Sequence, residues 1–182
     1  MPFSFQPLDI PEVIVITPKI FPDERGYFKE SFKGSDFQNV ALPEHFVQDN
    51  ISFSRQGVLR GLHYQKEPKA QGKLVSVISG TVWDVAVDMR PESSTFKRWV
   101  GIELNDDNHK MVYIPVGFAH GFLTLSKSAY FLYKCTNEYS PMHDAGIRWD
   151  DPEIAISWNV KNPILSPKDA ALPRLSDVLE EL

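Results

Sequence analysis

The sequence predicts an all-β fold, a sandwich or barrel with a few short helices at its periphery. Short segments rich in β-branched and aromatic residues follow one another at regular spacing, with Pro and Gly in the turns between them. In residues 81–88 the pattern alternates, so that Trp83, Val85 and Val87 share one face and the even-numbered residues share the other. No internal repeat or low-complexity linker interrupts the chain. We therefore expect residues 1–182 to form one domain.

The first strand is expected over residues 12–17, a β-branched stretch between Pro11 and Pro18. Proline at both ends suits a strand at the edge of a sheet, or one that is lent to a neighbouring chain. Such a short apolar strand needs a sheet to join. We therefore expect a homodimer in which residues 12–17 complete the sheet of the partner.

The next expected elements are a turn, a strand and a short helical turn, at residues 23–26, 27–32 and 35–40. In the strand that follows, residues 46–51, the side chains of Gln48 and Asn50 point to the same face. Two amides on one face suit recognition of hydroxyl or phosphate groups. They equally suit the solvated face of a sheet, and the residues alone leave both interpretations open.

The strongest strand signal is a hairpin over residues 74–88, whose turn contains Gly80. The remaining expected strands are residues 98–104, 110–114, 122–125 and 129–136. The C-terminal residues, from Ser166 onward, have the pattern of helices and not of strands. Ser166 followed by Pro167 is typical of a helix start, with Ser as the N-cap and Pro at the first position. A short amphipathic helix is expected over residues 175–182.

Charge and composition narrow the functional classes. The formal net charge is −5 at pH 7, which argues against a nucleic-acid-binding surface. No stretch approaches membrane-spanning length, and the first residues lack a basic segment followed by an apolar run. The single cysteine, Cys135, excludes an internal disulfide framework and suits a reducing compartment. We expect a cytoplasmic protein with no nucleic-acid or membrane partner.

Two stretches carry histidines in a recognisable frame. The first, residues 57–80, contains His63, and the second holds His120 in the sequence Pro-Val-Gly-Phe-Ala-His. Both resemble the paired motifs of the cupins. In metal-binding cupins the first motif also supplies a second His and a Glu, and at those positions this chain has Gln65 and Lys73.

This substitution changes the chemistry that the pocket can support. A divalent cation binds neutral imidazole and anionic oxygen, so an ammonium in the place of the carboxylate would repel it. Taken alone, Lys73 could be a surface lysine and His63 a satisfied interior histidine. With Arg60, His63, Lys73 and His120 all at cupin positions, we expect instead a pocket built for acid–base work and for holding negative charge. No metal and no organic cofactor is expected.

Several longer motifs stand out along the chain, from about Ile16 to about Asp169. They are Arg60-Gly-Leu-His63-Tyr-Gln, Gln71-Gly-Lys73-Leu-Val, Pro115-Val-Gly-Phe-Ala-His120-Gly-Phe, Gly146-Ile-Arg148-Trp149-Asp-Asp, Asp23-Glu-Arg25-Gly, Phe46-Val-Gln48-Asp-Asn50 and Leu132-Tyr133-Lys. Together these motifs resemble one family, the dTDP-4-dehydrorhamnose 3,5-epimerases.

The resemblance implies a cupin-type double-stranded β-helix, which is a jelly-roll barrel. It also implies a cofactor-independent epimerase of dTDP-L-rhamnose biosynthesis. Such an enzyme inverts C3 and C5 of dTDP-4-dehydro-6-deoxy-D-glucose and gives dTDP-4-dehydro-L-rhamnose. The expected partner is therefore a dTDP-4-keto-6-deoxyhexose substrate.

The reaction requires a base for a proton alpha to a carbonyl, a group that stabilises the enolate, and an acid on the opposite face. The resemblance implies that His63 is the base, oriented by Asp169, and that Tyr133 is the acid. Lys73 would meet the developing charge on the enolate oxygen. From sequence alone Asp169 equally reads as a residue of the first turn of a helix, and Tyr133 as a residue lining the barrel.

The resemblance also implies a set of binding residues. Arg60 and His120 would help Lys73 or hold the sugar, while Tyr139 and Phe28 could stack on thymine. Asp144 stands where the family commonly has Glu, so its contact depends on a shorter carboxylate. The residues that match nucleotide contact positions of the family are Arg25, Glu30, Gln48, Asn50, Asp144 and Lys168.

Three other functions remain open at this stage. The nearest is a mono-epimerase or ketoisomerase acting on a related dTDP-4-keto sugar, and loss of the acid would be one route to such narrower chemistry. A non-catalytic cupin that binds sugar nucleotides is disfavoured by the complete set of base, orienting carboxylate and acid. A metal-dependent cupin dioxygenase is disfavoured by Gln65 and Lys73.

Overall fold

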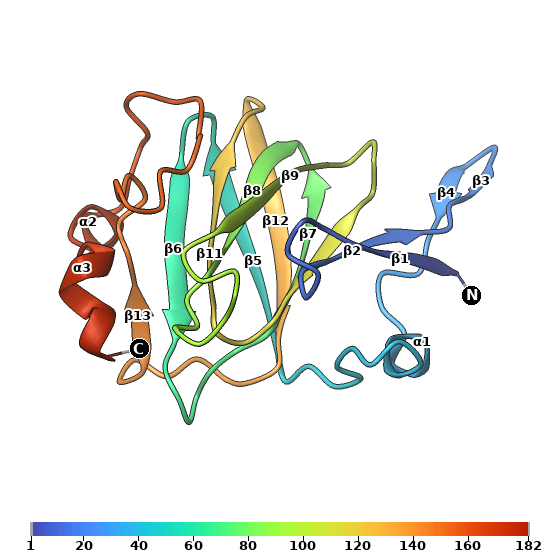
Figure 1. Ribbon diagram of the computed structural model, residues 1–182. Coiled ribbons are helices and arrows are strands. Elements are labelled where there is room, and N and C mark those ends of the chain that lie inside the picture. Colours follow the sequence, from blue (N-terminus) through green and yellow to red (C-terminus); the bar gives the residue numbers. More distant parts are fainter. Residues whose placement is uncertain (1, 182) are drawn as a thin grey trace.

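Two antiparallel sheets face each other in the computed structural model, which describes residues 2–181 (Figure 1). The larger sheet contains, in spatial order, β1 (Phe3–Pro7), β2 (Ile14–Pro18), β10 (Met111–Ile114), β7 (Lys73–Ser79), β12 (Ser128–Cys135) and β5 (Gln48–Arg55). The smaller sheet contains β13 (Asp144–Gly146), β6 (Leu59–Gln65), β11 (Phe118–Thr124), β8 (Thr81–Asp88) and β9 (Trp99–Asn105). The all-β prediction is confirmed, with the two-sheet arrangement of a jelly roll.

The remaining elements lie outside the two sheets. β3 and β4 form a separate hairpin, and the helices are short. Their bounds are β3 (Phe21–Asp23), β4 (Gly26–Phe28), α1 (Gly34–Gln38), α2 (Pro167–Ala170), α3 (Leu175–Val178) and the 3₁₀ helix η1 (Leu179–Glu181). Among residues 2–181 none of these helices is long and apolar enough to cross a membrane.

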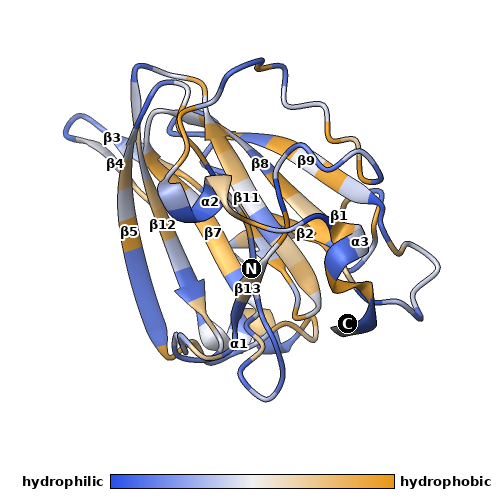
Figure 2. Cartoon of the chain, turned by 90° about the vertical axis from the view of Figure 1, so that its left-hand side faces the viewer, coloured by the Kyte–Doolittle hydropathy of each residue, from blue (hydrophilic) through white to orange (hydrophobic). Residues whose placement is uncertain are grey.

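The alternation predicted for residues 81–88 determines how the smaller sheet packs. Ala86 faces the space between the sheets, where Val75 and Phe131 of the larger sheet also belong to the buried cluster. Val85 and Val87 face outward and belong to a second buried cluster. In this cluster they pack with apolar residues of the C-terminal segment, among them Leu175. Hydrophobic residues therefore concentrate on the central strands, whereas one end of β5 is strongly hydrophilic (Figure 2).

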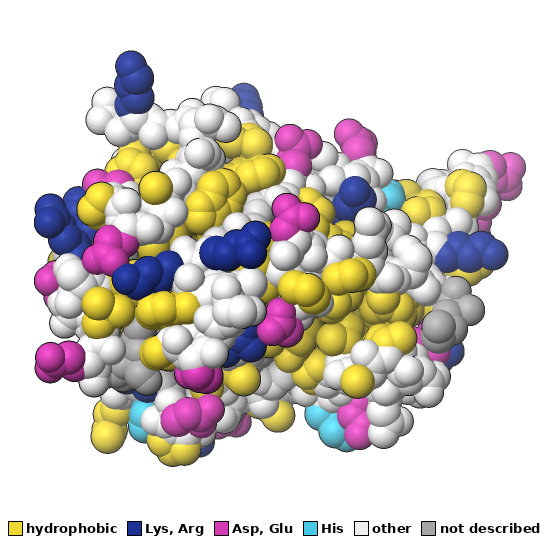
Figure 3. Space-filling model, viewed as in Figure 1, with side chains coloured by type: hydrophobic (Ala, Val, Ile, Leu, Met, Phe, Trp, Pro, Cys, Tyr) yellow, Lys and Arg dark blue, Asp and Glu magenta, His cyan; other side chains and the backbone are white. Residues whose placement is uncertain are grey.

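The outer face of the larger sheet is only partly covered. Phe37 of α1 is fully buried against Phe3 and Ile16 at the β1–β2 side of this sheet. Hydrophobic side chains of this region are visible between β1 and α1 (Figure 3). The other side, over β12 and β5, exposes Ile51 and Phe53.

The position predicted for the first strand is wrong. β2 contains most of the segment that we expected at an edge, but it lies between β1 and β10 of its own chain. The sequence reading did not recognise β1, whose residues pair with β2 from Phe3↔Pro18 to Pro7↔Ile14. Because this preceding strand takes the edge, residues 12–17 do not need a second chain to complete a sheet.

The hairpin of β3 and β4 projects away from the barrel, on the side opposite α2 (Figure 1). Its base contacts the turn between β9 and β10. The rings of Tyr27 and His109 lie 4.7 Å apart between centroids, and Lys29 Nζ lies 3.3 Å from His109 Nδ1. The hairpin is thus anchored at its base, while its tip reaches into solvent.

Candidate active site

A cavity of about 270 Å³ lies between the two sheets and contains all four predicted catalytic residues. It is lined by Ser52, Arg60, His63, Lys73, His120, Phe122, Phe131, Tyr133, Ser166, Lys168 and Asp169. A larger hollow of about 580 Å³ follows residues 149–161, but no histidine lines it. The cavity between the sheets is therefore the candidate active site.

A bulge in β6 brings Arg60 and His63 into the same cavity. Residues three apart on a regular strand point to opposite faces. Here His63 pairs with His120 and Arg60 pairs with Phe122, so β6 carries one residue more than β11 between these pairs. Gly61 lies in the bulge with φ +128°, and a Cβ there would be 2.5 Å from the backbone of β11. Glycine thus permits the close approach that aims both side chains inward.

His63 forms a short contact with Asp169, whose carboxylate Oδ1 lies 2.5 Å from the imidazole Nε2. Asp169 is held by Ser166, the N-cap of α2: the Asp169 amide donates to Ser166 Oγ, and Ser166 Oγ donates to Asp169 Oδ2 at 2.8 Å. Burial would raise the pKa of Asp169, but the hydrogen bond and charge of His63 outweigh it and lower that pKa. The helical and the orienting interpretations of Asp169 are therefore compatible.

Lys73 is buried at the start of β7, with only 8% of its surface exposed. Its Nζ donates to the backbone carbonyl of His63 at 3.2 Å. Burial lowers the pKa of Lys73, and the nearby Cys135, Asp144 and Asp84 oppose that shift. The ammonium stands beside His63 in the same cavity, as stabilisation of an enolate requires.

Tyr133 approaches the cavity from the opposite wall. It belongs to β12 of the larger sheet, whereas His63 belongs to β6 of the smaller one. Burial raises the pKa of Tyr133, although the charge of Arg60 opposes the shift. Arg60 is itself fixed, because its guanidinium donates to Ser54 Oγ at 3.0 Å and to the Phe53 carbonyl at 3.1 Å. The phenol therefore keeps its proton at neutral pH and can act as an acid.

His120 also has a carboxylate partner, which the sequence reading did not assign. Its Nε2 lies 2.8 Å from Asp84 Oδ2, and both residues are buried. The alternation in residues 81–88 did put Asp84 on the face shared with Ala86. Only the adjacency of β8 and β11, however, brings Asp84 to His120. Ser52 and Ser166 of the cavity lining were not assigned to the site either.

Five predicted binding residues are connected at one side of the cavity. The Tyr139 hydroxyl donates to Asp144 Oδ2 at 2.9 Å, and Lys168, which lines the cavity, makes an ion pair with the same oxygen. The Tyr139 amide donates to Gln48 Oε1 at 2.8 Å, and Gln48 donates to Asn50 at 2.9 Å. The shorter carboxylate of Asp144 thus reaches both Tyr139 and Lys168.

Gln65, at the position of a cupin metal ligand, instead supports the loop that carries Tyr139. Its amide nitrogen donates to the Lys69 and Glu138 carbonyls, and its oxygen accepts from the Ser140 amide at 2.7 Å. Among the described residues 2–181, no group of three or more His, Cys, Asp or Glu side chains is arranged to hold a metal ion.

Three predicted binding residues are not brought to the cavity of their own chain. Arg25 and Phe28 belong to the projecting hairpin, and Glu30 directly follows it. The Arg25 side chain is 84% exposed and pairs with Asp23 of the same turn. Phe28 is 65% exposed. α2, which lines the cavity, lies on the other side of the barrel (Figure 1).

Comparisons with known proteins identify the family of the chain. The model of the dTDP-4-dehydrorhamnose 3,5-epimerase family matches residues 7–177. The chain is 54% identical over 162 residues to the dTDP-4-dehydrorhamnose 3,5-epimerase of Shigella flexneri, covering 88% of this chain and 90% of that protein. It is 50% identical over 173 residues to the enzyme of Escherichia coli K12, covering 94% of each.

Solved structures show the same similarity. An epimerase from Legionella pneumophila in complex with dTDP-4-keto-L-rhamnose superimposes with a TM-score of 0.92 at 48% identity, over 96% of this chain and 93% of that one. A 3′-monoepimerase from Streptomyces bikiniensis in complex with dTDP-quinovose gives a TM-score of 0.91 at 31% identity, over 97% of this chain and 90% of that one. The cupin-type fold expected from the sequence is confirmed. The chain belongs to the dTDP-4-dehydrorhamnose 3,5-epimerase family.

Proposed function

We propose that this chain converts dTDP-4-dehydro-6-deoxy-D-glucose into dTDP-4-dehydro-L-rhamnose by inverting C3 and C5, as a step of dTDP-L-rhamnose biosynthesis. The observation that carries the proposal is one cavity in which His63, paired with Asp169, and Tyr133 stand on opposite walls beside Lys73. A base and an acid on opposite sides of a sugar ring are what inversion by proton removal and return requires.

The positions of His63, Lys73 and Tyr133 account for the steps of each inversion. His63 removes the proton alpha to the C4 carbonyl, and the electrons of the broken C–H bond pass to the carbonyl oxygen as an enolate. The Lys73 ammonium stabilises that oxygen. Tyr133 then returns a proton to the same carbon from the opposite wall, which inverts its configuration. The same groups serve C3 and C5, because both carbons flank the same carbonyl.

The connected polar residues beside the cavity suit the nucleotide end of the substrate. Lys168 brings positive charge for a diphosphate, and the amides of Gln48 and Asn50 can bond phosphate or sugar oxygens. The ring of Tyr139 is half exposed, with its hydroxyl tied to Asp144. This ring can therefore stack on a thymine base while Arg60 and His120 hold the sugar.

A mono-epimerase acting on a related dTDP-4-keto sugar is the second candidate, because a 3′-monoepimerase shares this fold at 31% identity. Relatives named as 3,5-epimerases reach 50–54% identity, which favours the double inversion. Incubation with the 4-keto sugar nucleotide in D₂O separates the two. NMR should show loss of both the C3 and the C5 proton signals with formation of the L-rhamno product. Exchange and inversion at one carbon alone would support the mono-epimerase.

The hairpin and the uncovered sheet face support a homodimer. On β5 and β12 the outward side chains Ile51, Phe53 and Tyr130 are about half exposed or more, and the rings of Phe53 and Tyr130 lie 5.0 Å apart between centroids. Such an apolar face on a sheet suits burial against a second chain. In this arrangement the hairpin of one chain supplies Arg25, Glu30 and Phe28 to the cavity of its partner. In this arrangement the segment exchanged between the two chains is the hairpin of β3 and β4, and not residues 12–17.

Mixing of two inactive variants tests this arrangement. His63→Asn removes the base, and the double variant Arg25→Ala/Phe28→Ala removes the hairpin contacts. A mixed dimer combines the intact cavity of the second variant with the intact hairpin of the first. Unfolding and refolding the two chains together should therefore restore activity, relative to each variant refolded alone. Absence of restoration, in mixtures shown to contain mixed dimers, would contradict the exchange of hairpins.

A cytoplasmic location and a lack of nucleic-acid or membrane partners complete the proposal. The net charge of −5 and the single buried Cys135 support them. Cell fractionation tests the location. Recovery of the protein in the membrane fraction would contradict it.

A further inference from the structure

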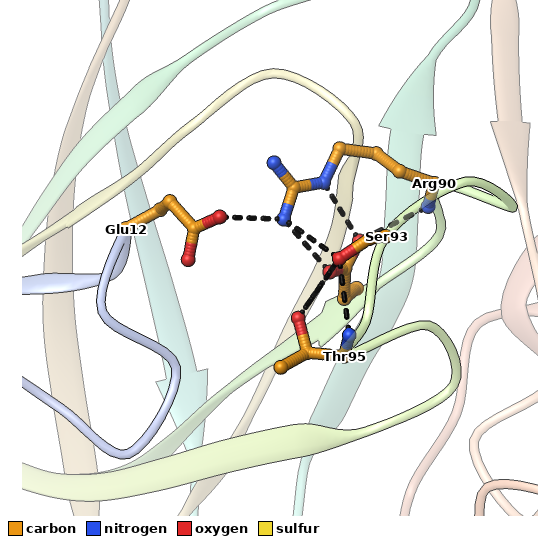
Figure 4. A network of polar contacts seen from close by, with 5 residues as sticks. Glu12, Arg90, Ser93 and Thr95 are labelled. Carbon is orange, nitrogen blue, oxygen red and sulfur yellow. Dashed lines mark hydrogen bonds and ion pairs between the residues drawn. The ribbon is translucent and has the colours of Figure 1, made fainter.

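Strand β8 carries two buried carboxylates on the same face, Asp84 and Asp88, with 2% and 0% of their surfaces exposed. Asp88 has an evident structural task. Its carboxylate accepts hydrogen bonds from Arg90, Ser93 and Thr95 and so holds the loop that leads to β9 (Figure 4). Asp84 lies four residues earlier and contacts His120, which lines the cavity.

The side-chain hydrogen bond of Asp84 goes to a residue of the active site. Its Oδ2 lies 2.8 Å from Nε2 of His120. This geometry follows from the pairing of β8 with β11, in which Asp84 stands opposite Phe122 and two pairs away from His120, on the same face of the sheet. Because Nε2 is committed to Asp84, only Nδ1 of His120 is left to meet a ligand in the cavity.

Asp84 also acts on Lys73 through its charge. Burial is the largest influence on the pKa of Lys73 and lowers it. Cys135, Asp144 and Asp84 raise that pKa, and Lys168 lowers it. Asp144 is the stronger of these two carboxylate influences and is paired with Lys168, while Asp84 is paired with His120. Asp84 is also buried, so its charge is little screened by solvent and favours the protonated form of Lys73.

We propose that Asp84 is a positioning residue of the active site, which fixes the tautomer of His120 and holds a carboxylate against the wall of the cavity that His120 and Lys73 share. In neutral His120 the proton then resides on Nε2, and Nδ1 presents a lone pair that accepts a hydrogen bond from a sugar hydroxyl. The inference rests on the proposed roles of Lys73 and His120 in the epimerase reaction. It assigns to β8 a contribution to both sugar binding and enolate stabilisation.

Two substitutions separate the two contributions. Asp84→Asn removes the charge, but its amide oxygen can still accept from His120 Nε2 and preserve the tautomer. Asp84→Leu removes both the charge and the acceptor and keeps the number and branching of the side-chain heavy atoms. Asp88→Asn is the matched control, because it makes the same chemical change at a buried position of the same strand, away from the cavity. Binding of dTDP, measured by calorimetry, checks that each variant is folded.

For Asp84→Asn we expect an unchanged KM and an alkaline limb of kcat that moves to lower pH by about one unit, since a nearby opposite charge shifts a pKa by about that much or more. For Asp84→Leu we expect the same movement and a KM raised on the order of tenfold. Partners that orient metal-bound histidines have effects of that size. Asp88→Asn should lower the melting temperature of the protein and leave the alkaline limb of kcat at the wild-type pH.

Titration of Lys73 through its ¹³Cε NMR signal gives a second readout that needs no turnover. Its pKa should fall in Asp84→Asn and stay at the wild-type value in Asp88→Asn. If the wild-type protein shows no turnover, the proposed function is refuted. The titration of Lys73 would still decide whether Asp84 acts on it. An unmoved limb and an unmoved Lys73 titration in Asp84→Asn would overturn the inference, even if Asp84→Leu fails to fold.

Discussion

His63 and Asp169 are 106 residues apart in the sequence, yet the imidazole Nε2 of one lies 2.5 Å from the carboxylate Oδ1 of the other. The bulge in β6 turns His63 inward, and the cap of α2 by Ser166 holds Asp169 in place. The pair therefore depends on two independent local structures that the fold brings together. It fixes the tautomer of His63 and orients the imidazole ring in the cavity.

Removing the base and removing its partner should differ in degree. His63→Asn should stop deuterium incorporation at C3 and C5 together, because neither enolate can form without the base. Asp169→Asn should lower kcat on the order of a hundredfold or more, since it perturbs the tautomer of His63. Ser166→Ala is the milder control, and loss of this cap should cost about 1 kcal/mol of stability. Exchange followed by NMR in D₂O measures the activity of the three variants, and urea unfolding measures the stability of Ser166→Ala. Retained exchange at either carbon in His63→Asn would show a second base.

The sequence alone predicted the all-β fold and the principal catalytic residues, because strand alternation and the motifs around these residues are patterns among near neighbours in the chain. Alternation in residues 81–88 separated the two faces of β8 without indicating which one lies between the sheets, and the motif around His63 identified Arg60 and Lys73 as its neighbours in the site. Residues three apart should lie on opposite faces of a strand, so strand periodicity alone would have separated Arg60 from His63. Only the bulge at Gly61 explains why both line the cavity.

What the sequence could not provide depends on the pairing of distant strands. Asp84 becomes a partner of His120 because β8 lies beside β11, and nothing near Asp84 in the sequence indicates this. The position of β2 was missed because residues 3–7, which form β1, were not recognised as a strand. The placement of Arg25 and Phe28 depends on how far the hairpin projects, which local patterns do not specify.

The alkaline limb of kcat should report Lys73. Burial lowers the pKa of Lys73, so Lys73 loses its proton at a lower pH than an ordinary lysine, whereas burial raises the pKa of Tyr133. The protonated form is the active one, and activity is therefore lost as pH rises through the Lys73 pKa. In Lys73→Arg, whose guanidinium stays charged, the limb should move to higher pH by one unit or more. If the alkaline limb of kcat in Lys73→Arg stays at the wild-type pH, a group other than Lys73 is responsible for it.

Catalysis should not depend on a metal ion. Gln65 and Lys73 stand at ligand positions of metal-binding cupins, and Gln65 is engaged with backbone groups of the loop that carries Tyr139. Activity should survive exhaustive dialysis against EDTA, and elemental analysis should find no stoichiometric transition metal. Loss of activity on chelation, with recovery on adding one divalent metal, would contradict the proposed mechanism.

The Asp88 network should stabilise the fold at neutral pH. Burial would raise the pKa of Asp88, but hydrogen bonds from Arg90, Ser93 and Thr95 outweigh it and lower the pKa to about 2. A lowered pKa contributes stability above the ordinary value of 3.8 that is lost as pH falls toward 2, here on the order of 2 kcal/mol. Urea unfolding at pH 7 and pH 2.5 measures this contribution.

The variant Asp88→Asn isolates the effect from that of other carboxylates. It should be less stable than wild type at pH 7 and should lose less stability on acidification. Arg90 also bonds to Glu12, so part of the loss reflects a weaker hold on the N-terminal segment (Figure 4). Identical acid sensitivity in wild type and variant would show that Asp88 is not the titrating group.

The last prediction separates the acid from the base. Tyr133→Phe removes the group that returns the proton and leaves His63, Asp169 and Lys73 in place. The enolate can still form and collapse back on its original face, so deuterium exchange should outrun inversion at C3 and C5.

This separation is expected because Tyr133 and His63 belong to different sheets and meet the sugar from opposite walls. NMR in D₂O measures exchange and inversion in the same sample, and Tyr130→Phe, at an outward position of the same strand, is the matched control. Equal loss of exchange and inversion in Tyr133→Phe would mean that Tyr133 acts before the enolate forms. Unimpaired inversion would remove Tyr133 from the mechanism, and the acid would then have to be sought among the other groups that line the cavity.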